Sequence, residues 1–354
     1  MRIALVTETF FPQVDGTTTT VKAVADGLVD AGHEVLVVAP APGLARYRAS
    51  HVARIQTREP RAPQVRTALE GFAPDLVHVT SPGALGRRAL KHAQRSGVPT
   101  IVVEQSPLLD RTVDYWRDRV AERADRVLVT SSWMQQRLAT EGVETGLWEP
   151  GVDTAAFHPG LRDQWLHDSW ARARSPRGAA VVVGYVGGLH KRHGVRRLAE
   201  LAEVPGIRPV LIGSGPQREW LALRLPDARL TGSLTTGDLT VALPTLDVLV
   251  HPGVHETCCH VLREAAASGV PVVAPRAGGA RHVVRHLESG VLYDPADPAD
   301  LRRAVAAVAA DRHRGLLGGR GRELAVRSWR DAVAELEVEH LRPLTGAEAL
   351  PSAR

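Results

Sequence analysis

Short apolar runs alternate along the chain with longer stretches that have helical spacing. Residues 2–8 form the first apolar run, and the helical stretch after it places Val21, Val24, Leu28 and Val29 on one face. Repetition of this alternation predicts βαβ units and a parallel sheet. In the first half of the chain the further strands are expected at 34–40, 52–57, 76–81, 99–105 and 126–132.

The second half of the chain repeats the alternation. Its strands are expected at 181–186, 209–213, 228–231, 248–251, 270–274 and 291–293. The pattern predicts an α/β protein with two doubly wound parallel-sheet domains, which the chain length also favours. The expected boundaries are 1–160 for the first domain, 161–180 for a polar, arginine-rich linker, 181–327 for the second domain, 328–341 for a C-terminal helix and 342–354 for a tail.

Two glutamates dominate the stretch 255–274. Glu256 and Glu264 are separated by seven residues, Gly269 is expected to end a short helix, and a buried strand follows. Eight positions along a helix span about 12 Å, so the two carboxylates would not share one proton or one metal ion. They could bind hydroxyl groups at two ends of an elongated ligand, with helix N-terminal amides between them. Two solvated acids are the alternative.

Glycines and strand ends supply the other candidate site residues. Gly16 lies between the first strand and its helix, where backbone amides and the helix dipole favour phosphate. Gly213 opens a tight glycine turn after a strand of the second half. His78, Glu104 and Gln105 lie near carboxyl ends of strands, where sites of parallel sheets are found. For His78, a core histidine with satisfied hydrogen bonds is the alternative.

The composition, 44% hydrophobic and 23% charged, is that of a globular protein. We expect a cytoplasmic location, because the sequence has neither a span of about 20 apolar residues nor a secretion signal. The isoelectric point is near 9.7, but the basic residues are scattered arginines, and the only lysines are Lys22, Lys91 and Lys191. No basic stripe is interleaved with aromatics, so nucleic acid is not the expected partner.

Cys258 and Cys259 are the only cysteines and are adjacent. Adjacent cysteines rarely form a relaxed disulfide. His255 and His260 are nearby and make zinc an alternative, but adjacent helical positions point about 100° apart and would not converge on one tetrahedral ion. We expect no metal and no cofactor.

Residues 1–17, 183–189 and 255–274 together resemble the family-4 retaining glycosyltransferases of GT-B architecture. Among these, the chain is most similar to actinobacterial mannosyltransferases that use GDP-mannose. The resemblance runs from residue 1 to about residue 340, and the glutamate block is its most specific piece. It implies two Rossmann-like domains with the donor held between them, and a C-terminal helix that crosses back onto the first domain.

The resemblance also implies an activity and roles for individual residues. The expected reaction is metal-independent, retaining transfer of a hexose, mannose favoured, from a nucleotide diphosphate sugar, GDP-mannose favoured, to an acceptor hydroxyl. Glu264 would bind the ribose, Glu256 the sugar hydroxyls, and His78 would line the transferred sugar. The other implied donor-side residues are Gly16, Gly188, His193, Gly213, Leu234, Cys258, Cys259 and His260.

The chain departs from the family pattern where the diphosphate binds. The family has an arginine where this chain has Gly188, and a lysine where it has His193. Loss of two fixed cations should slow departure of the diphosphate leaving group. Lys191 and Arg192 lie close by, and we expect them to substitute as catalytic cations.

A second departure is on the acceptor side. Glu104 and Gln105 precede Ser106 and Pro107, where the family carries a polar run. The acceptor class therefore stays open among small molecules, glycans and lipids. The arginine-rich stretch 114–126 could contact an anionic lipid at the inner face of the membrane, although a solvated helix face is favoured.

Three alternatives remain open. One is a natural-product glycosyltransferase that uses a UDP-sugar. Another is a catalytically degenerate nucleotide-sugar-binding protein, suggested by the two missing cations. The third is an enzyme of the same architecture that hydrolyses or epimerises nucleotide sugars without an acceptor.

Overall fold

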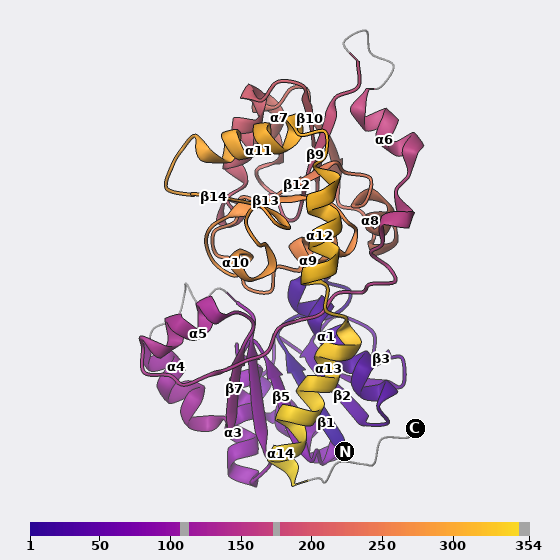
Figure 1. The fold of residues 1–354 in the computed structure, drawn as a ribbon. Coiled ribbons are helices and arrows are strands. Elements are labelled where there is room, and N and C mark those ends of the chain that lie inside the picture. Colours follow the sequence, from indigo (N-terminus) through magenta and orange to yellow (C-terminus); the bar gives the residue numbers. More distant parts are fainter. Residues whose placement is uncertain (107–112, 173–177, 347–354) are drawn as a thin grey trace, which may run out of the picture. The chain divides into compact units, whose positions relative to one another are not determined.

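The computed structural model describes residues 1–106, 113–172 and 178–346 of the chain. The chain divides into two compact units (Figure 1). The N-terminal unit consists of Met1–Pro150 with Trp329–Arg354, and the C-terminal unit is Gly151–Ser328. Pro107, parts of the expected linker (173–177) and of the expected tail (347–354) lie outside the described residues.

Within its described residues, the N-terminal unit has one eight-stranded sheet in the order β3-β4-β2-β1-β5-β6-β7-β8. Every pairing is parallel except that of β3 with β4. The strands are β1 (Arg2–Thr7), β2 (Glu34–Pro40), β3 (Arg46–Tyr47), β4 (Ser50–Ile55), β5 (Leu76–Thr80), β6 (Thr100–Glu104), β7 (Arg126–Val129) and β8 (Gly146–Leu147).

Helices cover both faces of this sheet, so its strands are apolar on both sides. On β1, Ala4 and Val6 join one core cluster, and Ile3 and Leu5 join the other. The helices are α1 (Gly16–Asp30), α2 (Arg61–Phe72), α3 (Gly86–Ser96), α4 (Val113–Arg119) and α5 (Ser132–Ala139), with a 3-10 turn at Ala121–Arg123.

The C-terminal helix returns to the N-terminal unit, as expected. It comprises α13 (Trp329–Glu335), a π-helical segment (Leu336–Leu341) and α14 (Arg342–Thr345). Trp148 Nε1 donates a hydrogen bond to Ala332 O at 2.8 Å. A Cβ on Gly27 of α1 would lie 2.8 Å from Val333 Cγ1. The Val333 side chain of α13 therefore packs directly against the backbone of α1.

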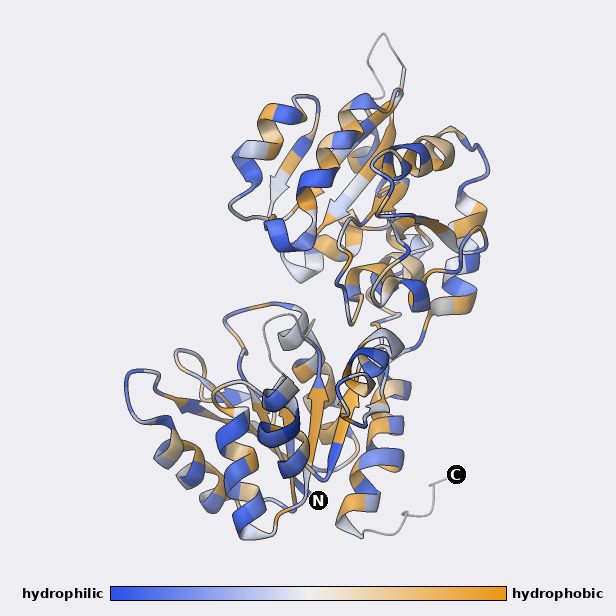
Figure 2. Cartoon of the chain, turned by 90° about the vertical axis from the view of Figure 1, so that its left-hand side faces the viewer, coloured by the Kyte–Doolittle hydropathy of each residue, from blue (hydrophilic) through white to orange (hydrophobic). Residues whose placement is uncertain are grey.

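The described part of the C-terminal unit has a fully parallel six-stranded sheet in the order β11-β10-β9-β12-β13-β14. Figure 2 shows apolar strands inside this unit and polar residues on the outer faces of its helices. The strands are β9 (Val181–Val186), β10 (Ile207–Ile212), β11 (Arg229–Gly232), β12 (Val248–Val250), β13 (Val272–Pro275) and β14 (Gly290–Tyr293).

The helices of this unit are α6 (Gln164–Ala171), α7 (Arg218–Arg224), α8 (Thr236–Ala242), α9 (His260–Ala267), α10 (Ala280–Val283), α11 (Asp300–Ala310) and α12 (Gly315–Ala325). Short 3-10 segments form at Pro159–Leu161, Lys191–His193 and Val195–Glu203. No helix among the described residues is both long and apolar enough to cross a membrane.

The expected linker contains helix α6, which the sequence analysis did not predict. The Asp163 side chain caps the helix by accepting from Leu166 N–H at 2.8 Å. Trp170 and Ala171 are buried in the core of the C-terminal unit. The expected linker, residues 161–180, is therefore only partly a linker, because α6 packs against the C-terminal unit.

Candidate active site

Helix α9 is shorter than the glutamate block suggested. It begins at His260, so Glu256 lies in the preceding loop and only Glu264 is helical. The spacing expected from a continuous helix is therefore wrong. At the other end Val270 N–H donates to Ala265 O and Gly269 N–H to Ala266 O, at 2.9 and 3.0 Å. These two bonds form a Schellman motif with Gly269 at φ +67°, and they delay the start of β13.

The loop before α9 is held in a conformation that favours glycine. Cys259, the N-cap residue, has φ +52°. Cys258 and Cys259 are both free thiols and both buried. A Cβ on Gly279 would lie 2.5 Å from Thr257 O and 3.1 Å from Cys259 Sγ, so the loop packs closely against the start of α10. His260 begins α9 and is partly buried.

Two histidines flank the carboxylate of Glu256. His251 Nε2 lies 3.2 Å from Glu256 Oε1, and His193 Nδ1 lies 3.6 Å from the same oxygen. Burial opposes ionisation, but the charge of His251 and the hydrogen bond from His193 outweigh it and hold the pKa of Glu256 well below its usual range. The carboxylate is therefore ionised and acts as a hydrogen-bond acceptor.

His251, which sequence reasoning missed, follows β12 and is 4% exposed. Its ring stacks on that of Tyr185, with centroids 6.2 Å apart and planes at 20°. Tyr185 OH donates to Gly188 O at 3.1 Å. The only signal in the sequence was its place at the carboxyl end of a predicted strand.

Two glycine turns pack against each other beside these residues. Gly187 N–H donates to Ile212 O at 3.0 Å, and Leu189 N–H donates to Ser214 O at 2.8 Å. Gly213 has φ +144°, and a Cβ there would lie 1.9 Å from Gly187 O. A side chain at Gly213 would therefore separate the two turns.

His193, which the sequence analysis expected at the position of a lysine, contacts other polar residues. Lys191, Arg192 and His193 form the short 3-10 turn, in which Lys191 and Arg192 are exposed. Arg192 Nε donates to His193 Nε2 at 3.3 Å, and His193 Nδ1 faces Glu256. A Cβ on Gly188 would meet His190 Cδ2 at 3.1 Å. The residues 188–193 and Glu256 thus form one cluster that carries a guanidinium.

Glu264 lies on α9 and is partly exposed. Desolvation raises its pKa to about 7. Leu234, predicted to face the nucleotide, packs against the core of the C-terminal unit and follows Ser233, whose Oγ lies 2.8 Å from Ser214 Oγ. This contact joins the glycine turn after β10 to the segment after β11.

In the N-terminal unit, Gly16 is the first residue of α1, as expected, and it is exposed. The N-cap residue is Asp15, whose Oδ1 accepts from Thr18 N–H at 2.8 Å. One amide of the predicted phosphate cradle is therefore already bonded to a carboxylate.

His78 lies in the middle of β5 rather than near its end. It pairs in register with Leu5 and Ile101 and is 2% exposed. Burial lowers its pKa to about 4, so the ring is neutral. The predicted contact with a transferred sugar stays a prediction, and it would require this buried ring to become accessible. Among the described residues neither ring nitrogen has a hydrogen-bond partner, so the alternative of a satisfied core histidine does not describe it.

Glu104 and Gln105 do lie at the carboxyl end of β6. Both are buried, at 2% and 6% exposure. Burial raises the pKa of Glu104 even though Ser106 N–H donates to its carboxylate. In the arginine-rich stretch nearby, Arg117 pairs with Asp114 and Asp118 at 2.8 and 2.9 Å, a contact typical of a solvated helix face.

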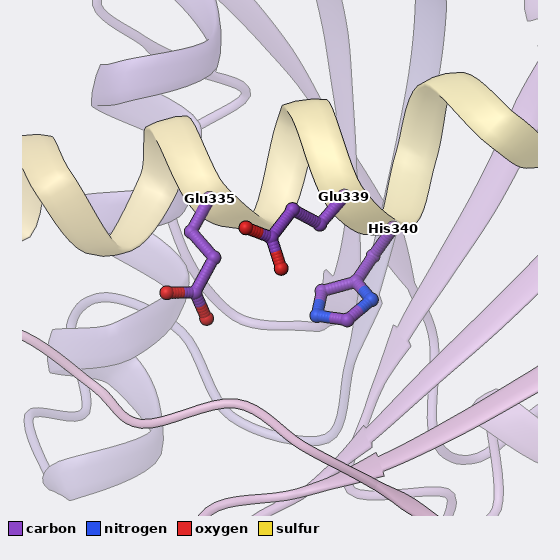
Figure 3. Close-up of side chains that lie close together, drawn as sticks. All are labelled: Glu335, Glu339 and His340. Atoms are coloured by element: carbon purple, nitrogen blue, oxygen red, sulfur yellow. The ribbon is translucent and has the colours of Figure 1, made fainter.

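One cluster in the described residues has the composition of a metal site. Glu335, Glu339 and His340 gather on the C-terminal helix (Figure 3). Arg126 NH1 lies 2.8 Å from His340 Nδ1 and also donates to Glu339 O. A guanidinium at this imidazole opposes a bound cation, so the cluster fits a hydrogen-bonded contact of the C-terminal helix better than a metal centre.

Comparisons with known proteins match both halves of the chain. The family model described as glycosyltransferase family 4 matches residues 14–156, and that described as glycosyl transferases group 1 matches residues 180–311. The GDP-mannose-dependent alpha-mannosyltransferase of Mycolicibacterium smegmatis is 36% identical over 383 residues, with 100% of both chains covered. The enzyme of the same name from Corynebacterium glutamicum is 34% identical, covering 86% of this chain and 80% of the relative.

A solved structure shows the same fold. Sucrose-phosphate synthase from Thermosynechococcus elongatus superposes with a TM-score of 0.79, covering 98% of this chain and 100% of the other. The sequence identity is 21%, so this likeness concerns the fold alone.

Proposed function

The chain belongs to glycosyltransferase family 4, and from this premise we propose that it transfers mannose from GDP-mannose to an acceptor hydroxyl with retention of anomeric configuration. The observation that carries the proposal is the ionised Glu256, held beside the two glycine turns and eight residues before Glu264. Mannose and GDP are favoured because the relative that matches the whole chain at 36% identity is named a GDP-mannose-dependent alpha-mannosyltransferase.

In this proposal the two glutamates bind different parts of the nucleotide sugar. Glu256 accepts hydrogen bonds from hydroxyl groups of the sugar, and Glu264 accepts them from the ribose hydroxyls. Both tasks need a carboxylate. Glu256 is ionised throughout the physiological range, whereas Glu264, with a pKa of about 7, must lose a proton to accept two hydroxyl donors.

The leaving diphosphate needs a cation near Gly188. Of the two expected substitutes, Arg192 is the better supported, because its Nε contacts His193, which in turn contacts Glu256. A guanidinium offers paired N–H donors that match phosphate oxygens. This cation, the backbone amides of the glycine turns and the start of α9 would stabilise the developing negative charge without a metal ion.

The test is calorimetric titration of the purified protein with GDP, GDP-mannose, UDP and UDP-glucose, followed by product analysis with each sugar nucleotide. Preferential binding of the guanine pair and release of GDP with acceptor supplied support the proposal. Preference for the uracil pair would replace it with a UDP-sugar transferase. Release of free sugar without an acceptor would indicate a hydrolase.

A degenerate sugar-nucleotide-binding protein is the second candidate, and a specific observation favours it. Neither position that carries a family cation holds one, since Gly188 has no side chain and His193 is directed at Glu256. This candidate predicts nucleotide binding without turnover, and a Glu256→Gln variant that functions as well as the wild type.

A further inference from the structure

His251 is held rigidly at the edge of the candidate site. Its N–H donates to Val273 O at 2.8 Å, so the pairing of β12 with β13 sets the position of its backbone. Tyr185, which is 1% exposed, covers one face of the imidazole. Rotation of the imidazole away from Glu256 would require a core ring to move.

The backbone leaves room for the contact between His251 and Glu256. A Cβ on Gly253 would lie 2.8 Å from His251 Nε2 and 3.0 Å from Glu256 Oε1. Any residue other than glycine at this position would place a Cβ in close contact with both the imidazole and the carboxylate, so at least one of them would have to move. The close approach of His251 to Glu256 therefore depends on glycine at position 253.

His193 and His251 differ in how exposed their side chains are, and therefore in how easily a ligand can move them. Both approach Glu256 Oε1, so neither uses Oε2, which can accept hydroxyl groups. The His193 side chain is 33% exposed and lies on the turn with Arg192, so a diphosphate can draw it away from Glu256. The His251 side chain is 5% exposed and remains in place.

We propose that His251 is a positioning residue for sugar transfer, which holds Oε1 of Glu256 so that Oε2 faces the hydroxyl groups of the transferred sugar. The inference rests on the proposed function, in which Glu256 binds that sugar. With a proton on Nε2, the imidazole can donate to Glu256 Oε1, which lies 3.2 Å away. A small misplacement of a group that orients substrate is costly in rate.

The test compares His251→Leu with His251→Gln, because glutamine keeps an N–H donor and leucine does not. For His251→Leu we expect kcat to fall about 10- to 100-fold and the affinity for the sugar nucleotide to fall with it. The affinity for the nucleoside diphosphate alone should stay within about twofold, since that ligand lacks the sugar. His251→Gln should recover most of the loss.

Gly253→Ala provides an independent route to the same effect, because it separates the two groups without removing either. Gly319→Ala is the matched control, since a Cβ there meets nothing within 4 Å. An equal loss of affinity for the sugar nucleotide and for the diphosphate in all three site variants would show a structural role and overturn the inference. Unchanged kcat in His251→Leu would also overturn it. A wild-type protein that transfers sugar from none of the nucleotide sugars would instead overturn the proposed function.

Discussion

His33 Nε2 lies 2.9 Å from Glu337 Oε1, and the two side chains are 8% and 9% exposed. The same oxygen accepts from Arg342 NH2 at 2.5 Å, and the N-terminal amine of Met1 lies 3.3 Å from His33 Nδ1. This network joins the start of the chain and the turn before β2 to the π-helical segment of the C-terminal helix. It therefore contributes to holding that helix on the N-terminal unit.

We expect Glu337→Gln to lower the free energy of unfolding at pH 7 by about 1.5–3 kcal/mol, because a charged acceptor is replaced in a nearly buried network. Burial opposes ionisation of Glu337, but Arg342 and His33 outweigh it and lower its pKa. A lowered pKa in the folded state stabilises the protein above the unfolded value and loses that contribution as pH falls through the folded value. Urea unfolding of wild type and variant should therefore converge in acid; a difference that grows below pH 4 would contradict this.

The close packing of Gly27 of α1 against Val333 also holds the C-terminal helix on the N-terminal unit. Gly27→Ala would place Cβ 2.8 Å from Val333 Cγ1, so we expect a loss of about 1–3 kcal/mol in the free energy of unfolding from overpacking. Gly71→Ala on α2 meets nothing within 4 Å and should be neutral or stabilise by up to about 1 kcal/mol. If the double variant Gly27→Ala, Val333→Ala is no more stable than the sum of the two single changes predicts, the close approach is not the cause.

The sequence predicted much of the fold because both sheets are buried on two faces. Strands β2 and β9 lie at the expected residues, and β13 begins two residues late because Val270 completes the cap of α9. β3 and β8 have two residues each, too few to show a period. Helix α6 was missed because its few buried residues stand among many polar ones.

The candidate site was predicted less completely, for a different reason. Glu256, Glu264 and Gly188 could be recognised by position, but contacts depend on which strand ends meet in space. His251 reaches Tyr185 of β9 because β12 pairs with β9, a long-range pairing that no local pattern reveals. The same limit applies to His78, whose place inside β5 is set by its partners on β1 and β6.

Glu264 makes nucleotide affinity dependent on pH. With a pKa of about 7 in the free protein, the carboxyl is partly protonated at neutral pH. Ribose hydroxyl donors favour the carboxylate, so binding should lower this pKa and release a proton. We expect GDP affinity to rise between pH 6 and pH 8, and Glu264→Gln to bind more weakly with a flat profile. Calorimetry in buffers of different ionisation enthalpy measures the proton released; affinity that falls over this range would show that Glu264 does not accept the ribose.

Arg192 and Lys191 differ in their relation to the site, and this difference predicts which one replaces the missing family cations. The Arg192 guanidinium contacts His193, whereas the Lys191 side chain has no hydrogen bond or ion pair within the part of the chain that the structure describes. A charge-assisted hydrogen bond to phosphate contributes about 1.5–3 kcal/mol, so Arg192→Ala should weaken GDP binding about tenfold or more. Lys191→Ala should weaken it by less than about twofold. Guanosine, which lacks phosphate, is the control ligand, and its affinity should be the same in both variants. If calorimetry finds the larger loss of GDP affinity in Lys191→Ala, Lys191 is the cation that binds the leaving diphosphate. If both variants bind GDP as tightly as the wild type, neither residue contacts the diphosphate.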